Sequence, residues 1–119
     1  TIGTMQETLD MAIDLNGEFA NFYSAMAYPG SKLYDMALEK GLQLPSNWHG
    51  FSQHSFETTP LPTNYLTSGE VLKFRDNAFH TYFENPGYLS MIEKKFGNDV
   101  KNHLILMTKT RLKRKLYSY

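Results

Sequence analysis

The chain has 119 residues, which is about the length of one domain. Hydrophobic residues make up 41% of it, aromatic residues 14% and charged residues 20%, a composition that excludes a disordered chain. Twelve basic residues balance twelve acidic ones, and no apolar run approaches the roughly 18 residues of a membrane-spanning helix.

The chain contains no cysteine. This excludes a disulfide framework, a thiolate metal site and a cysteine nucleophile within these residues. The first residues do not have the pattern of a secretory signal or a transit peptide. We therefore expect a cytoplasmic protein without a membrane partner.

The first predicted element is a helix. Thr4 followed by Glu7 has the spacing of a capping box, and Gly17 is a suitable end. The apolar residues between them recur at helical spacing: Met5, Leu9, Ala12 and Ile13.

Residues 18–27 (EFANFYSAMA) predict a buried strand, because apolar or aromatic side chains occupy both alternating faces. A second, weaker strand is predicted at residues 51–58. So few strands leave backbone groups along their edges unpaired. Three explanations are open: the first strand pairs weakly here, it pairs with another chain, or its neighbours lie in another part of a longer protein. We favour the last of these.

The sequence Tyr28-Pro29-Gly30-Ser31 predicts a turn. Ser31 is a suitable cap for a helix that runs to about Lys40, with Gly41 as its stop. Residues 42–66 contain three prolines and read as a connecting loop, which we expect Trp48, Phe51 and Phe56 to attach to a core.

The remaining chain predicts helices as far as about Lys115. Thr67 and Glu70 form a second capping box, Asn85-Pro86 begins another helix, and a last helix begins near Asp99, after Gly97. A wide apolar stripe follows the second capping box: Val71, Leu72, Phe74, Ala78, Phe79, Tyr82 and Phe83.

These elements predict an α+β fold that is mostly helical, with one or two strands and four to five helices. We divide it into a helix–strand–helix unit at residues 1–41, a Pro-containing connecting loop at 42–66 and a helical subdomain at 67–119.

Two groups of polar residues are candidate sites. Asp76, His80 and Glu84 recur every four residues, as in a metal or acid–base site, but surface ion pairs use the same spacing. We interpret them as facing solvent. His49 and His54 lack a third ligand, so no metal site is predicted.

Five cations crowd residues 109–115. Such a tail can contact nucleic acid or anionic lipid. The interpretation we favour is that these cations complement the dipole in the last turn of a helix, so no nucleic-acid partner is expected.

Two stretches resemble radical S-adenosylmethionine (radical SAM) proteins. Residues 4–34 are similar to the part of that family in which a helix leads into the last barrel strand and a Tyr-Pro-Gly-Ser/Thr turn. The series Trp48, PLPTNYL, FRDNAFHTYF, NPGYL and KKFG looks like the C-terminal region of one subfamily. That subfamily contains the anaerobic magnesium-protoporphyrin IX monomethyl ester oxidative cyclase and has a cobalamin-binding domain.

The resemblance implies that the chain is the end of a partial (β/α) barrel with a C-terminal helical extension, in an Fe–S oxidoreductase or methyltransferase-like enzyme. The family's cluster-binding loop, Cys-x3-Cys-x2-Cys, is absent from this sequence. We therefore expect no cofactor in this chain, and a 4Fe-4S cluster and S-adenosylmethionine in the parent enzyme. Whether cobalamin takes part stays open, as do the substrate and the reaction.

By the same resemblance, Tyr28, Pro29, Gly30 and Ser31 would line the S-adenosylmethionine or substrate site, since barrel strands point their C-terminal ends at the active site. The alternative is that this turn only reverses the chain. No catalytic residue or metal ligand is implied.

The expected partner is the remainder of the parent polypeptide, with self-association through residues 18–27 where that remainder is missing. The alternative function is a free-standing helical interaction module without catalysis.

Overall fold

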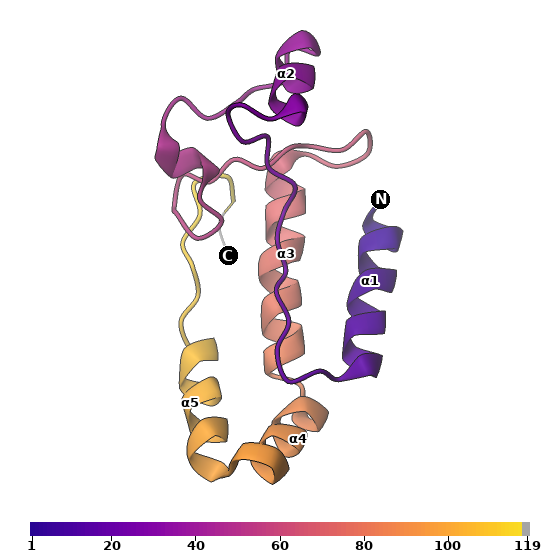
Figure 1. Ribbon diagram of the computed structural model, residues 1–119, viewed down its shortest axis with the longest axis vertical. Helices are drawn as coiled ribbons and strands as arrows, with labels where there is room; N and C mark the ends of the chain where they lie inside the picture. Colours follow the sequence, from indigo (N-terminus) through magenta and orange to yellow (C-terminus); the bar gives the residue numbers. More distant parts are fainter. Residues whose placement is uncertain (118–119) are drawn as a thin grey trace. The chain divides into compact units, whose positions relative to one another are not determined.

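The structure, a computed structural model, describes residues 1–117 and contains α-helices and one short 3-10 helix in that range (Figure 1). The elements are α1 (Ile2–Leu15), α2 (Lys32–Glu39), η1 (Trp48–Phe51), α3 (Ser68–Phe83), α4 (Pro86–Phe96) and α5 (Asn98–Thr108). Residues 1–117 include no strand. The predicted α+β fold is therefore right in its helices and wrong in its strands.

The chain forms two compact units, and α3 contributes to both. The first unit comprises residues 1–22 and 76–111, and the second comprises residues 23–75 together with the residues from Leu112 onward. The three-part division at residues 1–41, 42–66 and 67–119 describes an expected parent enzyme and stays a prediction.

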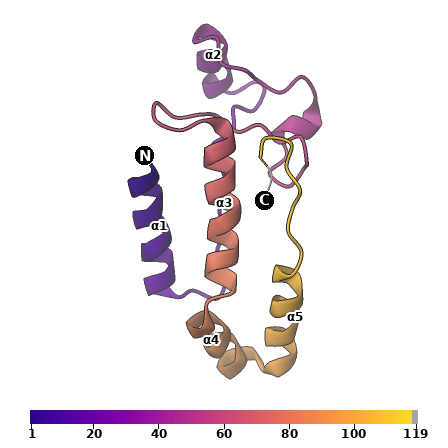
Figure 2. The ribbon, with the colours of Figure 1, turned by 180° about the vertical axis from the view of Figure 1, so that it is seen from behind.

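The first unit is built around a cluster of buried side chains from α3 and α4: Tyr82, Phe83, Tyr88 and Ile92. The rings of Tyr82 and Tyr88 lie 5.1 Å apart, a favourable separation for an aromatic pair. Ala12 and Ile13 of α1 pack against this cluster, and α4 packs on α5, which turns back from it (Figure 2). The apolar stripe predicted for α3 is thus part of the core.

Helix α1 begins earlier than the sequence predicts. Thr1 is the N-cap, and its Oγ1 accepts a hydrogen bond from the backbone N–H of Thr4 at 3.2 Å. Asn16, before Gly17, ends the helix in the left-handed conformation with φ 47°, which asparagine tolerates better than most residues. The predicted capping box of Thr4 and Glu7 is therefore wrong, because Thr4 itself occupies the third helical position.

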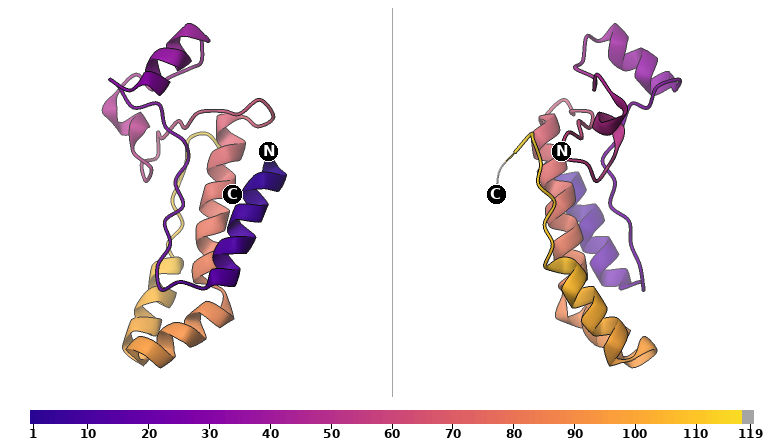
Figure 3. Two further views of the ribbon diagram at one scale, coloured as in Figure 1. Left: turned by 45° about the vertical axis from the view of Figure 1, so that its right-hand side comes forward. Right: turned by 90° about the vertical axis from the view of Figure 1, so that its left-hand side faces the viewer.

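Residues 18–27 form no strand, so the predicted strand is wrong. In the first unit, Phe22 packs against a helix, since its ring lies 5.7 Å from that of Tyr82. Figure 3 shows this segment leaving the end of α1 as an irregular trace. Alternating apolar residues match a strand, yet the surface that receives Phe22 is the aromatic cluster of α3 and α4.

The second predicted strand, at residues 51–58, is also wrong. Phe51 ends η1, and turns follow it. The backbone N–H of Thr59 donates to the carbonyl of Gly50 at 2.9 Å. This bond returns the chain to η1, so an extended run from residue 51 to 58 cannot form.

Three predicted helix boundaries are confirmed. Ser31 Oγ accepts from the backbone N–H of Tyr34 at the start of α2, and Thr67 and Glu70 exchange the bonds of a capping box. Pro86 stands in the first turn of α4.

The last predicted boundary is wrong. Helix α5 ends at Thr108, and its last turn carries no basic residue. The cations of residues 109–115 therefore follow the helix instead of complementing its dipole. Among residues 1–117, no helix is both long and apolar enough to cross a membrane.

Candidate functional site

The Tyr28–Ser31 segment is a β-turn that leads directly into α2. The backbone N–H of Ser31 donates to the carbonyl of Tyr28 at 3.1 Å, and Gly30 has φ 85°. A positive φ at the third residue of a turn favours glycine. The predicted turn is therefore confirmed.

Ser31 joins the turn to the helix. Its Oγ donates to the carbonyl of Tyr28 at 2.6 Å and accepts from the backbone N–H of Tyr34 at 3.1 Å. One hydroxyl thus fixes both the turn and the first turn of α2. Gly30 is exposed, and no atom approaches within 4 Å of the position that a Cβ would occupy there.

A cavity of about 370 Å³ lies beside this turn. Pro29 lines it together with Tyr34, Pro45, Trp48 and Phe51 and with the polar residues Ser46 and Asn47. The Trp48 side chain is 77% exposed, and its ring centre lies 6.3 Å from that of Phe51. Of the four residues predicted to line a ligand site, Pro29 borders this cavity, and Tyr28, Gly30 and Ser31 are not among its lining residues.

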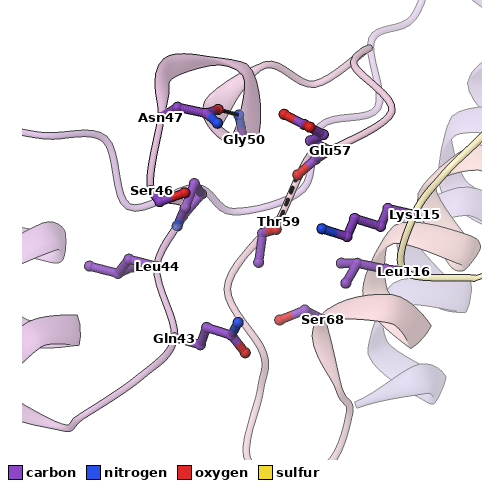
Figure 4. Close-up of a pocket in the computed structure, with 11 residues that line it drawn as sticks. Gln43, Leu44, Ser46, Asn47, Gly50, Glu57, Thr59, Ser68, Lys115 and Leu116 are labelled. Atoms are coloured by element: carbon purple, nitrogen blue, oxygen red, sulfur yellow. Dashed lines mark hydrogen bonds between the residues drawn. The ribbon is translucent and has the colours of Figure 1, made fainter.

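A second cavity of the same unit, of about 360 Å³, is polar (Figure 4). Four short stretches of chain contribute its walls: Gln43, Leu44, Pro45, Ser46, Asn47 and Gly50; Glu57 and Thr59; Ser68; and Lys115 and Leu116. Both cavities share the stretch from Pro45 to Asn47.

Two close approaches of the backbone at glycines build this polar cavity. A Cβ at position 50 would lie 2.2 Å from the Cβ of Pro45, and a Cβ at position 69 would lie 3.1 Å from the carbonyl oxygen of Leu116. Only glycine permits the first approach without displacement of the chain. The wall stretches therefore meet because of the residues at these positions.

Arg114 holds the C-terminal wall in place. Its guanidinium group is buried and donates to the carbonyls of Gln53 and Ser55, each at 2.8 Å. The next residue, Lys115, donates its backbone N–H to the carbonyl of Phe56 at 2.8 Å. Charged donors form the stronger class of hydrogen bonds, so Arg114 fixes the place from which the Lys115 side chain extends.

The charged groups at this cavity are one carboxylate and one ammonium group. In the part of the chain that the structure describes, neither Glu57 nor Lys115 forms an ion pair within 4 Å. Both are exposed. Figure 4 shows the Lys115 side chain reaching toward Thr59, whose hydroxyl donates to the backbone carbonyl of Glu57 at 3.2 Å.

The Asp76, His80 and Glu84 series lies in the first unit. Asp76 and His80 are 5% and 8% exposed, so their predicted position facing solvent is wrong, while Glu84 is exposed as expected. Buried positions extend around α3 and not along one stripe, which explains the error. Nδ1 of His80 lies 3.2 Å from Oε1 of Glu84, the predicted spacing of a helical pair.

No group of three or more metal-ligating side chains occurs among residues 1–117. His49 and His54 are both exposed. Sequence reasoning missed the polar cavity, because its walls come from stretches up to about seventy residues apart. The one available signal was Gly50 in a loop of bulky residues, since an isolated glycine often marks a close backbone approach.

Comparisons with known proteins identify no relative: no family model, no curated protein and no solved structure matches this chain.

Proposed function

We propose that this chain is the C-terminal segment of a radical SAM enzyme, in which it closes the barrel and shapes the substrate pocket without binding the cluster. The ordered series of motifs that resembles the family carries this proposal. The turn at Tyr28–Ser31, with its positive φ at Gly30 and its capped helix, supports it.

The aromatic cavity beside Pro29 is a second support. In a barrel, the residues that follow the C-terminal end of a strand line the active site. Pro29 follows the segment that would be the last strand in the parent, and the cavity that it borders has aromatic walls from Tyr34, Trp48 and Phe51. Ligand pockets of this size with aromatic linings are common.

The parent enzyme would supply the groups that this chain lacks. Residues 18–27 form no strand here. In the parent, neighbouring strands would complete a sheet along them. The cluster and S-adenosylmethionine would be bound by the preceding part of the polypeptide.

The coding sequence upstream of Thr1 tests this proposal directly. A Cys-x3-Cys-x2-Cys run in the same reading frame is the expected result, and an initiation codon adjoining Thr1 would refute it. The longer product, purified without oxygen, should then cleave S-adenosylmethionine reductively.

Two matched glycine variants of the longer product test the role of the turn. Gly30→Ala and Gly41→Ala both place a Cβ at a positive φ with no atom within 4 Å, so both introduce similar strain. We expect Gly30→Ala to raise the KM for S-adenosylmethionine or substrate and Gly41→Ala to leave it unchanged. If both variants change the KM equally, Gly30 serves only to reverse the chain.

Exposed aromatic side chains at residues 18–27 favour self-association of the isolated chain. Phe19 and Tyr23 are 68% and 62% exposed, and their burial would recover about 25 cal/mol per Å² of apolar area. Tyr23→Glu should weaken concentration-dependent association in sedimentation velocity, whereas Tyr65→Glu, at a similarly exposed tyrosine, should not. A chain that stays monomeric at every concentration would contradict this.

A further inference from the structure

We infer that the polar cavity of Figure 4 is a binding site for a small zwitterion of the free amino acid class. This inference concerns the second unit alone and does not depend on the radical SAM proposal. It follows from the charges, the neutral polar groups and the apolar groups that line one cavity.

The lining charges favour a ligand with both signs of charge. Lys115 offers an ammonium group and Glu57 offers a carboxylate, and neither forms an ion pair within the described residues. A carboxylate-bearing ligand would gain from Lys115, and an ammonium-bearing ligand would gain from Glu57. A strong anion such as phosphate would be repelled by Glu57, and a simple cation would be repelled by Lys115.

The rest of the lining suits the body of an amino acid. The side chains of Gln43, Ser46, Thr59 and Ser68 offer hydrogen-bonding groups without net charge. Pro45 and Leu116 offer apolar contact to an aliphatic group. A volume of about 360 Å³ is sufficient for a single small molecule.

The site is also held in place before any ligand binds. Gly50 and Gly69 allow the close approaches to Pro45 and Leu116, and the buried Arg114 fixes the stretch that carries Lys115. The charged groups of the cavity are therefore presented by a wall that is hydrogen-bonded to the rest of the unit. Preorganisation of this kind lowers the entropic cost of binding.

L-Leucine is the probe, and two analogues of the same shape test the charges without any variant. 4-Methylpentanoate lacks the ammonium group, and 3-methylbutylamine lacks the carboxylate. We expect L-leucine to shift the amide resonances of Gly50 and Gly69 in a saturable way in heteronuclear NMR. Each analogue should bind at least about tenfold more weakly, because each loses one charge-assisted hydrogen bond.

Four variants test the two charges on the protein. Lys115→Gln and Glu57→Gln should each weaken L-leucine binding at least about tenfold. Lys113→Gln and Glu39→Gln remove exposed charges of the same unit that do not line the cavity, and they should leave the affinity unchanged.

The other outcomes refute the inference, each in a distinct way. If inorganic phosphate or 4-methylpentanoate binds better than L-leucine and Glu57→Gln strengthens that binding, the site is an anion site. If glucose binds and neither charge variant changes its affinity, the site is a polyol site. If L-leucine at about 50 mM, a concentration well above a millimolar Kd, shifts neither the Gly50 nor the Gly69 amide resonance, the cavity is not an amino acid site.

Discussion

Two tyrosine hydroxyls attach the end of α1 to the aromatic core of the first unit, and their removal is the most direct test of that core. The Tyr82 hydroxyl donates to the carbonyl of Gly17 at 2.5 Å, and the Tyr88 hydroxyl donates to the carbonyl of Glu18 at 2.8 Å. Both side chains are almost fully buried. Tyr82→Phe and Tyr88→Phe would keep the rings and remove only these two donors.

Each hydroxyl should contribute a modest amount. Both bonds are only partly buried, and a net hydrogen bond is worth about 0.5–1.5 kcal/mol. We therefore expect each Phe variant to lower the free energy of unfolding by about 0.5–1.5 kcal/mol. Tyr82→Ala also removes the ring from the cluster and should cost roughly 3–5 kcal/mol.

The double variant adds a sharper expectation. The two acceptor carbonyls belong to consecutive residues, so loss of one bond frees the segment that the other bond holds. The two losses should therefore be less than additive, as is usual for groups that share one structural element.

Urea unfolding followed by circular dichroism measures these effects. Tyr65→Phe is the control, because Tyr65 is 75% exposed, and its midpoint should not move. If Tyr82→Phe and Tyr88→Phe both unfold at the midpoint of the unchanged chain, the hydroxyls do not hold residues 17 and 18, and the packing described for the end of α1 is wrong.

The remaining predictions concern pH, the buried arginine and the absent thiolates. Burial raises the pKa of Tyr82, and the nearby Glu18 carboxylate raises it further. Burial is also the largest cause of the raised pKa of Tyr88, with smaller contributions from Tyr82 and Glu18. The folded chain thus keeps protons that the unfolded chain releases near pH 10. The stability that these tyrosines contribute should be fully present below about pH 10 and should fall as the pH rises further. Tyr82→Phe should make the free energy of unfolding decrease less steeply with pH, and an equal slope in the variant and the unchanged chain would contradict this. Arg114→Met should lower the free energy of unfolding by roughly 2–4 kcal/mol, because two carbonyls lose their donor. Arg111→Met should leave the free energy of unfolding nearly unchanged. In Arg114→Met, the backbone amide of Lys115 should exchange its hydrogen faster than in the unchanged chain. Reconstitution of the 119-residue chain with iron and sulfide should leave it colourless, because no cysteine is present; a stable brown protein with charge-transfer absorption would overturn that expectation.

Local signals predicted those parts of the fold that depend on neighbouring residues. The cap at Ser31, the capping box of Thr67 and Glu70, and the Pro86 start of α4 each involve partners three or four positions away. Such bonds can be predicted from the sequence where the helix begins at the expected residue; at Thr4 and Glu7 the spacing is the same, but the helix begins earlier, with Thr1 as its N-cap. The predicted turn at residues 28–31 succeeded for the same reason.

The two strand predictions failed because alternation does not specify what covers a segment. Phe22 alternates with its neighbours as in a strand, but it packs on Tyr82, sixty positions along the chain. A strand requires a second strand with the correct register, and none is formed in residues 1–117. An apolar pattern therefore does not specify secondary structure by itself, because the partner against which the segment packs decides it.

Sequence patterns also failed to predict which polar side chains are buried. The spacing of Asp76 and His80 predicts a solvent-facing pair because surface ion pairs recur in the same way, and Arg114 belongs to a predicted basic tail, yet all three are less than a tenth exposed. The interior tolerates a charged group when it meets a partner of suitable chemistry, as the guanidinium of Arg114 meets two carbonyls. Those carbonyls belong to residues about sixty positions earlier, so charge patterning along the tail carries no trace of them. The polar cavity depends on that distant pairing, because Arg114 positions the wall from which Lys115 extends. The walls of this cavity therefore come together through a contact that only the folded chain reveals.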